Sequence, residues 1–268
     1  MLEQLGLNLR AVYARLWVRI KGGNREPEWL VAEMIIPIFT LSTYVYLYRM
    51  VGAPEYAGFV IIGGTMLAFW SNILWNMSAQ FYWEKETGTL EVYFIAPISR
   101  MAILLGMALG GIVNTTLRAV AILVAGTLIF QVPLVLNEPL TALGLFFLTI
   151  IALYALGMMF ASLFMLYGRE AWHTANLLQE PVQFLSGTYF PVSKLPSMVQ
   201  LFASLIPLTV GLDGIRRVVI LGEGIAGVWP NVVALVIFIL ILLPLAKLSL
   251  SFMENLGKKE GRLTLRWQ

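Results

Sequence analysis

The chain has 268 residues, of which 59% are hydrophobic and 12% are charged, and its formal net charge is +3. An average soluble domain carries about 25% charged residues, so this composition and a mean hydropathy of +0.81 exclude an ordinary water-soluble enzyme. The lack of cysteine excludes disulfides, thiolate metal sites and a cysteine nucleophile, and the single histidine, His173, argues against a histidine-built metal site.

Residues 1–27 are predicted to form an amphipathic helix that lies in the membrane interface. Apolar residues recur at spacings of three and four, and basic residues occupy the other faces. The apolar stripe consists of Leu2, Leu5, Leu9, Val12, Leu16 and Ile20, and the basic residues are Arg10, Arg15, Arg19 and Lys21. A striped pattern without a small-residue cleavage site argues against a signal peptide.

Residues 28–268 are predicted to form a single all-α integral membrane domain. Six apolar stretches are long enough to cross a bilayer, and they lie at about 29–48, 56–82, 101–130, 140–167, 171–189 and 228–253. The connection 190–227 between the fifth and sixth stretches is too apolar for a solvated loop, and prolines and glycines interrupt it. We expect it to form short re-entrant helices packed inside the protein.

The distribution of basic residues predicts the orientation. Thirteen of the 18 Lys and Arg residues fall on the side that holds both termini, four fall on the other side, and Arg118 lies inside the third stretch. The positive-inside rule therefore places both termini in the cytoplasm, with an even number of spans. Residues 255–268 form a short basic cytoplasmic tail.

Residues 84–97, between the second and third stretches, carry the strongest local signal. Gly88 is placed to cap a short helix, and Pro97 is placed to end it. The predicted helix lies parallel to the membrane, with carboxylates and apolar groups directed toward the cytosol. That shape suits docking into a groove of a soluble partner. A plain loop joining two spans is the alternative.

Two motifs, in this order, resemble the ABC-type-2 permeases, the membrane subunits of a class of ABC exporters. The first is Glu86-Thr-Gly-Thr-Leu-Glu91, followed by Pro97 and Arg100. The second is Leu185-Ser-Gly-Thr-Tyr-Phe-Pro-Val-Ser-Lys-Leu-Pro196, then Ile206-Pro-Leu and Gly211-Leu-Asp-Gly-Ile-Arg216. The amphipathic helix, the six spans and the cytoplasmic termini fit the layout of that family, so the resemblance covers essentially the whole chain.

The resemblance implies a permease subunit that pairs with a second one, as a homodimer, in the cell membrane, each subunit resting on an ATPase subunit. It assigns residues 84–97 as the coupling helix that contacts the ATPase, through Glu84, Glu86, Thr87, Gly88, Thr89, Leu90, Glu91 and Pro97. It assigns the region 190–227 and its approach to an outer gate, shaped by Gly187, Phe190, Pro191, Pro196, Pro207, Asp213 and Arg216. Cargo would leave the cytoplasm or inner leaflet.

The partner is expected to bind the ATP and magnesium, because this chain has no phosphate-binding loop motif of its own. We expect no cofactor, metal or nucleic acid on this chain. The resemblance favours an amphiphilic substrate, either drug-like, lipid or lipid-linked saccharide. A passive channel or secondary transporter without an ATPase is the alternative function. A membrane-embedded enzyme is disfavoured because we find no catalytic cluster.

Polar residues inside the apolar stretches are candidates for the translocation path, since ionisable groups in lipid usually face protein or water. Asn176, Gln179, Glu180 and Gln183 share one helical face, for which we favour a path or dimer-interface role over interhelical packing. Asn72 and Asn76 are one turn apart and could line the path or bond across a dimer, but we favour interhelical packing for them. We hypothesise that Arg118 pairs with Glu180, or alternatively that it extends to the outer interface. Glu33 is assigned to an interfacial cluster of charged residues.

Overall fold

The computed structural model describes residues 2–23, 25, 27–135, 137–167 and 170–261, so the end of the predicted basic tail lies outside the described residues. All the regular elements among the described residues are helices. The long ones are α1 (Leu2–Gly23), α2 (Pro27–Met50), α3 (Ala57–Ser71), α6 (Arg100–Phe130), α7 (Pro139–Tyr167), α8 (Glu170–Leu185) and α11 (Ile225–Glu260). The short ones are η1 (Pro54–Tyr56), η2 (Asn72–Ser78), α4 (Gln80–Glu86), α5 (Thr89–Ile95), η3 (Val192–Lys194), α9 (Ser197–Ala203) and α10 (Pro207–Val219).

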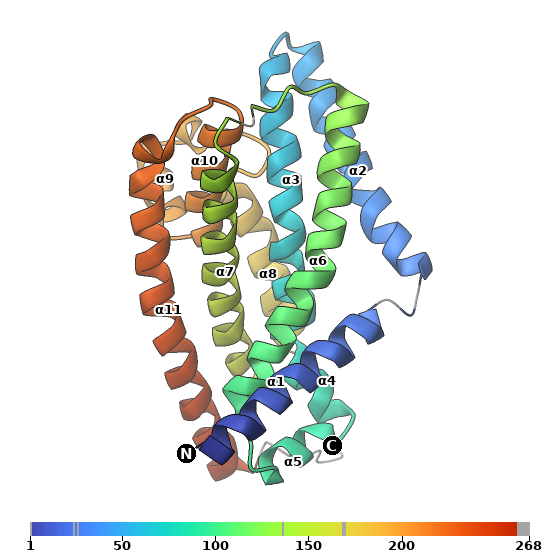
Figure 1. Ribbon diagram of the computed structural model, residues 1–268, viewed down its shortest axis with the longest axis vertical. Coiled ribbons are helices and arrows are strands. Elements are labelled where there is room, and N and C mark those ends of the chain that lie inside the picture. Colours follow the sequence, from blue (N-terminus) through green and yellow to red (C-terminus); the bar gives the residue numbers. More distant parts are fainter. Residues whose placement is uncertain (1, 24, 26, 136, 168–169, 262–268) are drawn as a thin grey trace.

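The long helices form an upright bundle, and α1 crosses it obliquely near one end (Figure 1). We call this end, formed by α1, α4, α5 and the last turns of α11, the basal end. The opposite end, formed by η1, α9, α10 and the connection from α6 to α7, is the distal end. The prediction of an all-α integral membrane protein is confirmed.

Five helices among the described residues are long and apolar enough to cross a membrane, and a sixth crossing is possible if α9 and α10, which meet at a 100° bend, form one broken span. The fifth predicted stretch forms α8, which has 16 residues, fewer than the roughly 20 needed to cross alone. The helix ends early because Gly187 adopts a left-handed backbone with φ of 65° and turns the chain. The bend and the turn together make 190–227 a series of short helices, as predicted.

The hydrophobic core lies where α3 and η2 pack against α6, α7 and α10. Phe69 and Ile73 are fully buried there, and Leu153 on α7 lies among them. The second wall of the bundle is the pairing of α7 with α11, the most extensive helix–helix interface among the described residues. In contrast, α2 packs on α3 and α6 along one side only, so much of its surface is exposed.

The amphipathic helix α1 packs closely on α6, which corrects part of the predicted pattern. A Cβ atom placed on Gly106 of α6 would lie 2.5 Å from the carbonyl oxygen of Val12, so the two backbones touch. The face of α1 that bears Arg15 and Arg19 therefore points toward the bundle, not toward solvent. An apolar stripe is exposed instead, formed by Leu5, Leu9, Tyr13 and Trp17.

Candidate functional site

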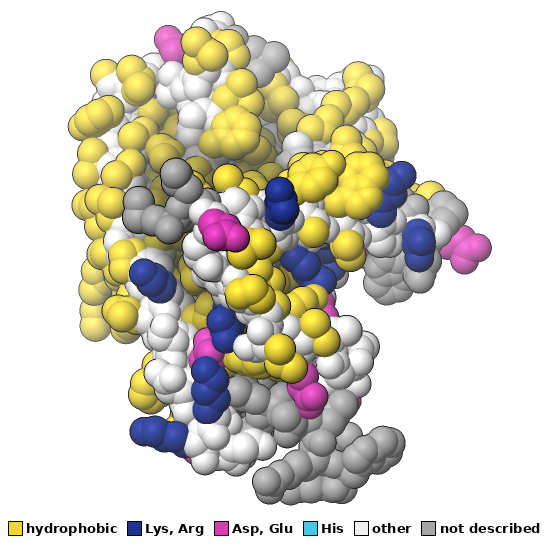
Figure 2. Space-filling view, turned by 60° about the horizontal axis from the view of Figure 1, so that its bottom comes forward, with side chains coloured by type: hydrophobic (Ala, Val, Ile, Leu, Met, Phe, Trp, Pro, Cys, Tyr) yellow, Lys and Arg dark blue, Asp and Glu magenta, His cyan; other side chains and the backbone are white. Residues whose placement is uncertain are grey.

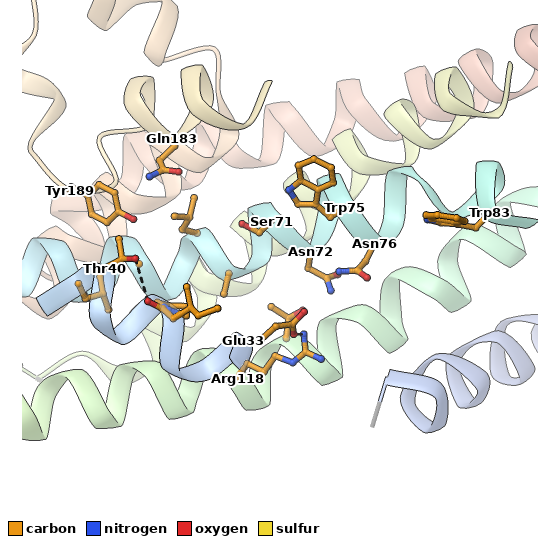
Figure 3. Close-up of a pocket in the computed structure, with 17 residues that line it drawn as sticks. Glu33, Thr40, Ser71, Asn72, Trp75, Asn76, Trp83, Arg118, Gln183 and Tyr189 are labelled. Carbon is orange, nitrogen blue, oxygen red and sulfur yellow. Dashed lines mark hydrogen bonds and ion pairs between the residues drawn. The ribbon is translucent and has the colours of Figure 1, made fainter. Parts of the chain in front are cut away.

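A cavity of about 600 Å³ lies between α2, α3, η2, α6 and α8. Its volume falls within the roughly 300–1,000 Å³ of small-molecule sites. Figure 3 shows Gln183 and Tyr189 on one side and Glu33 with Arg118 on the opposite side. The polar lining residues come from four separate segments of the chain, and the sequence marks Asn72, Asn76, Arg118 and Gln183 as candidates. The structure brings these four together around one cavity.

The second span is not a continuous α-helix where it borders the cavity, because Asn72–Ser78 forms a π-helix. The hydroxyl of Ser78 donates to the carbonyl of Ile73, five residues earlier, at 2.9 Å. Asn72, Trp75 and Asn76 all line the cavity from this element. Asn72 is held by Tyr154 of α7, whose hydroxyl donates to its side-chain oxygen at 3.1 Å. Wide turns of this kind are frequent at functional sites.

Arg118 forms an ion pair with Glu33 of α2, and the hypothesis of an Arg118–Glu180 pair is wrong. The first turns of α6 lie beside α1 rather than in the apolar part of the bundle. Arg118 lies eight residues beyond Gly110, which touches α1, and that separation is about 12 Å along a helix. Glu33 of α2 pairs with it there, and the predicted interfacial cluster of charged residues around Glu33 stays a prediction.

The polar face of α8 is divided between the cavity and the outer surface. Gln183 lines the cavity, and Gln179 donates to the Ser71 hydroxyl at 3.3 Å. Asn176 and Glu180 are exposed. An exposed carboxylate on a membrane helix requires protein or water beside it, so the predicted role of this face in a path or a dimer interface stays a prediction.

The segment between the second and third spans folds as two short helices, α4 and α5, joined at Gly88. Gly88 has a φ of 74° and caps α5, as predicted, and Leu90 is buried beneath the helix. The outer surface carries the carboxylates of Glu86 and Glu91. On the same surface, Val92 is 62% and Ile95 is 84% exposed.

The exposed part of this element also includes Thr87 and Pro97. The basal face on which it lies combines apolar side chains with separate acidic and basic ones (Figure 2). We call the surface formed by Glu86, Glu91, Val92 and Ile95 the docking face. An exposed apolar surface beside two carboxylates is suited to a protein partner.

Glu84 does not share that exposure, which corrects the expectation that the carboxylates of this segment all point outward. It is 8% exposed and accepts hydrogen bonds from Arg15 of α1 at 2.5 Å and from Gln80 at 2.8 Å. Thr89 also donates to it. Burial raises the pKa of Tyr93 to about 12, so its hydroxyl stays protonated and donates to Glu84 at 3.2 Å. Glu84 thus joins α1, α4 and α5.

Two more hydrogen bonds fasten α1 to the chain that follows α5. The side chain of Asn8 accepts from the backbone of Ser99 at 2.8 Å, and Gln4 donates to the carbonyl of Pro97 at 2.8 Å. The docking face therefore sits on a firmly attached helix rather than on a plain loop.

Arg216 organises the region assigned to an outer gate. Its guanidinium is buried and donates to the carbonyls of Gly187 at 2.7 Å, Thr188 at 2.6 Å and Phe59 at 2.8 Å. It thereby ties α10 both to the turn after α8 and to α3. The gating role itself stays a prediction.

The other candidates of that region lie at its bends and edges. Pro191 precedes η3, Pro196 precedes α9 and Pro207 begins α10. Phe190 packs against Phe184 with ring centroids 5.4 Å apart. Asp213 is exposed and accepts from Asn231 at 3.0 Å.

An all-helical bundle with several apolar helices of membrane length defines a multi-pass membrane protein. Comparison with known families makes this specific. The family model described as ABC-2 type transporter matches residues 9–220, so the chain belongs to that family. The family consists of membrane permeases rather than catalytic enzymes.

Two relatives illustrate the range of similarity. Nodulation protein J of Rhizobium leguminosarum bv. trifolii is 37% identical over 102 residues, which is 38% of this chain and 38% of that protein. The inner membrane transport permease YadH of Escherichia coli strain K12 is 22% identical over 194 residues, which is 69% of this chain and 75% of that protein. The first match thus spans well under half of the relative's length.

Proposed function

We propose that this chain is the transmembrane subunit of an ATP-driven exporter and that its docking face binds a separate ATPase subunit. The observation that carries the proposal is the docking face itself. Carboxylates of Glu86 and Glu91 flank the exposed Val92 and Ile95 at the basal end, and the helix is fastened to α1 through Glu84. A partner that moves α5 therefore moves α1 as well.

Membership of the ABC-2 family and the charge distribution support this assignment. Among the described residues, α1, α4, α5 and the last turns of α11 carry seven Lys and Arg residues, whereas η1, α9, α10 and the connection from α6 to α7 carry two. The positive-inside rule therefore favours a cytoplasmic location for the basal end. ATP and magnesium would be bound by the partner. ATP binding would then shift the permease between inward- and outward-open forms, because the partner's contacts with α5 differ between the two forms.

The cavity is the proposed path for the substrate. Carboxamides of Asn72, Asn76 and Gln183, together with a Glu33–Arg118 pair without net charge, offer both donors and acceptors. Apolar and aromatic side chains from the same helices form the remainder of the lining. This mixture suits an amphiphile, whose polar part meets the amides while its apolar part lies along the helices.

A second copy of the chain is the proposed partner within the membrane. Glu180 and Asn176 are exposed on α8, and α2 exposes Ile36 and Phe39, which are 63% and 69% accessible. Pairing two copies through these helices would shelter the polar groups from lipid and would bring two cavities together.

The test is co-purification with a phosphate-loop ATPase, sought first among the genes beside this one, followed by ATP hydrolysis assays. Glu91→Lys should abolish association, because it reverses the charge of one of the two carboxylates of the docking face. Glu55→Lys, the same change at an exposed position of the distal end, should leave association intact. Equal association of the two variants would refute the docking face, and substrate flux in proteoliposomes without any ATPase would indicate a channel or secondary transporter.

A further inference from the structure

The last turns of α11 extend past the membrane-spanning part of the bundle and reach the docking helix. With 36 residues, α11 is about 54 Å long, whereas the hydrocarbon core of a bilayer is about 30 Å thick. The excess lies at the basal end, beside α5 (Figure 1). Met253 and Leu256 pack against the same core cluster as Tyr93 and Phe94 of α5.

Glu254 forms a polar link between the two elements. It accepts from Arg100 at 3.1 Å and from Lys258 at 2.7 Å. Arg100 in turn lies over the ring of Phe94, with its guanidinium carbon 5.3 Å from the ring centre, and it donates to the carbonyl of Ile98 at 3.3 Å. The carboxylate of Glu254 on α11 thus binds Arg100, which in turn contacts the end of α5.

The Arg100–Glu254 ion pair is partly buried. The side chains of Arg100 and Glu254 are 25% and 16% exposed, so salt screens the pair less than a fully exposed one. In addition, α5 has seven residues, and helices that short are not stable in isolation. Its position is therefore set by the elements that hold it, which are α1 on one side and α11 on the other.

We propose that Glu254 is a positioning residue that couples α11 to the docking helix, so that a displacement of α5 is passed to α11. From there it reaches α7, which lies along α11 and also contacts the π-helix at the cavity. The proposal rests on the proposed function, since it requires an ATPase that acts on α5. This connection from α5 to α11 is separate from the connection of α5 to α1 through Glu84.

The chain has no cysteine, so a single introduced thiol reports on each end of the route. Ile95→Cys on the docking face measures docking, and Ile225→Cys, at the distal start of α11 and 54% exposed, measures movement of α11. Each is assayed as a maleimide labelling rate in the complex with the neighbouring ATPase, without nucleotide and with ATP plus vanadate. In the parent protein we expect the ATPase to protect the thiol at position 95 and the nucleotide to change the labelling rate at position 225.

Glu254→Gln keeps the size of the side chain and removes its charge. We expect it to retain co-purification, ATP hydrolysis and protection of the thiol at position 95, and to lose the nucleotide response at position 225. Lys259→Gln, an exposed neighbour on the same helix, should keep that response. Glu254→Asp, which keeps the carboxylate that Arg100 and Lys258 contact, should retain the response, which ties the loss in Glu254→Gln to the charge at position 254.

The outcomes separate the two proposals. If the ATPase does not protect the thiol at position 95 in the parent protein, the proposed function fails, and this inference fails with it. If that thiol is protected but the labelling rate at position 225 responds equally in the parent and in Glu254→Gln, or does not respond in either, the inference alone is overturned.

Discussion

Arg216 is the clearest test of how the distal region is held together. Its guanidinium donates to three backbone carbonyls, those of Phe59, Gly187 and Thr188. Arg216→Met keeps much of the apolar stem but leaves these carbonyls without their donor. A hydrogen bond to a charged group contributes about 1.5–3 kcal/mol, but losses within one cluster do not add. We therefore expect the free energy of unfolding to fall by at least about 1–3 kcal/mol, the cost of leaving a buried acceptor unsatisfied.

The adjacent residue provides a matched control. Arg217 pairs with Glu223 at 2.6 Å, and both side chains are 32% exposed, so Arg217→Met should lower the free energy of unfolding by about 0–1 kcal/mol. Both variants are measured by equilibrium unfolding in detergent micelles, followed by tryptophan fluorescence. If Arg216→Met unfolds at the same denaturant concentration as Arg217→Met, the three carbonyls do not depend on Arg216 and the reasoning is wrong.

Two further predictions concern α1 and the cavity. Gly106→Leu should force α1 away from α6 and destabilise the protein by about 1–3 kcal/mol, because a Cβ there meets the Val12 carbonyl at 2.5 Å. Gly144→Leu, at a position with open space around it, should leave stability unchanged. Equal melting temperatures of the two variants would contradict the close packing of α1 on α6. Glu33→Gln should lower the free energy of unfolding by about 1–3 kcal/mol, and with it the melting temperature, because the guanidinium of Arg118 loses its counter-charge. The exchange Glu33→Arg with Arg118→Glu should recover most of this loss. An unchanged melting temperature in Glu33→Gln would rule out the pair.

The sequence predicts the fold well where apolar length alone decides. The predicted stretch 101–130 differs by one residue from the helix Arg100–Phe130. The sixth predicted stretch ends near 253, but α11 continues to Glu260. Hydropathy predicts where the apolar part of a helix ends, but the helix itself can continue beyond that point. The polar extension is helical because it packs on the core and carries the Glu254–Lys258 pair one turn apart.

The candidate site is predicted less completely, because side-chain partners depend on how helices shift along one another. Asn72, Asn76 and Gln183 can be found from the sequence because amides within apolar stretches are conspicuous. The partner of Arg118 is missed because nothing in the sequence reveals that α1 packs against the first turns of α6. Glu84 is placed outward for a similar reason, since only the packing of α1 brings Arg15 beside it.

Three arginines join parts of the chain that are distant in sequence. Arg15 binds Glu84, Arg118 binds Glu33, and Arg216 binds the carbonyl of Phe59. The hydrophobic effect does little to drive helices together in lipid, so directional polar contacts contribute strongly to which helices pack against each other. The links of Arg15 and Arg216 each lie at one end of the bundle. The link of Arg118 instead joins α2 to α6 in the wall of the cavity, so any widening between these two helices must stretch or break it. The pair therefore opposes separation of α2 from α6.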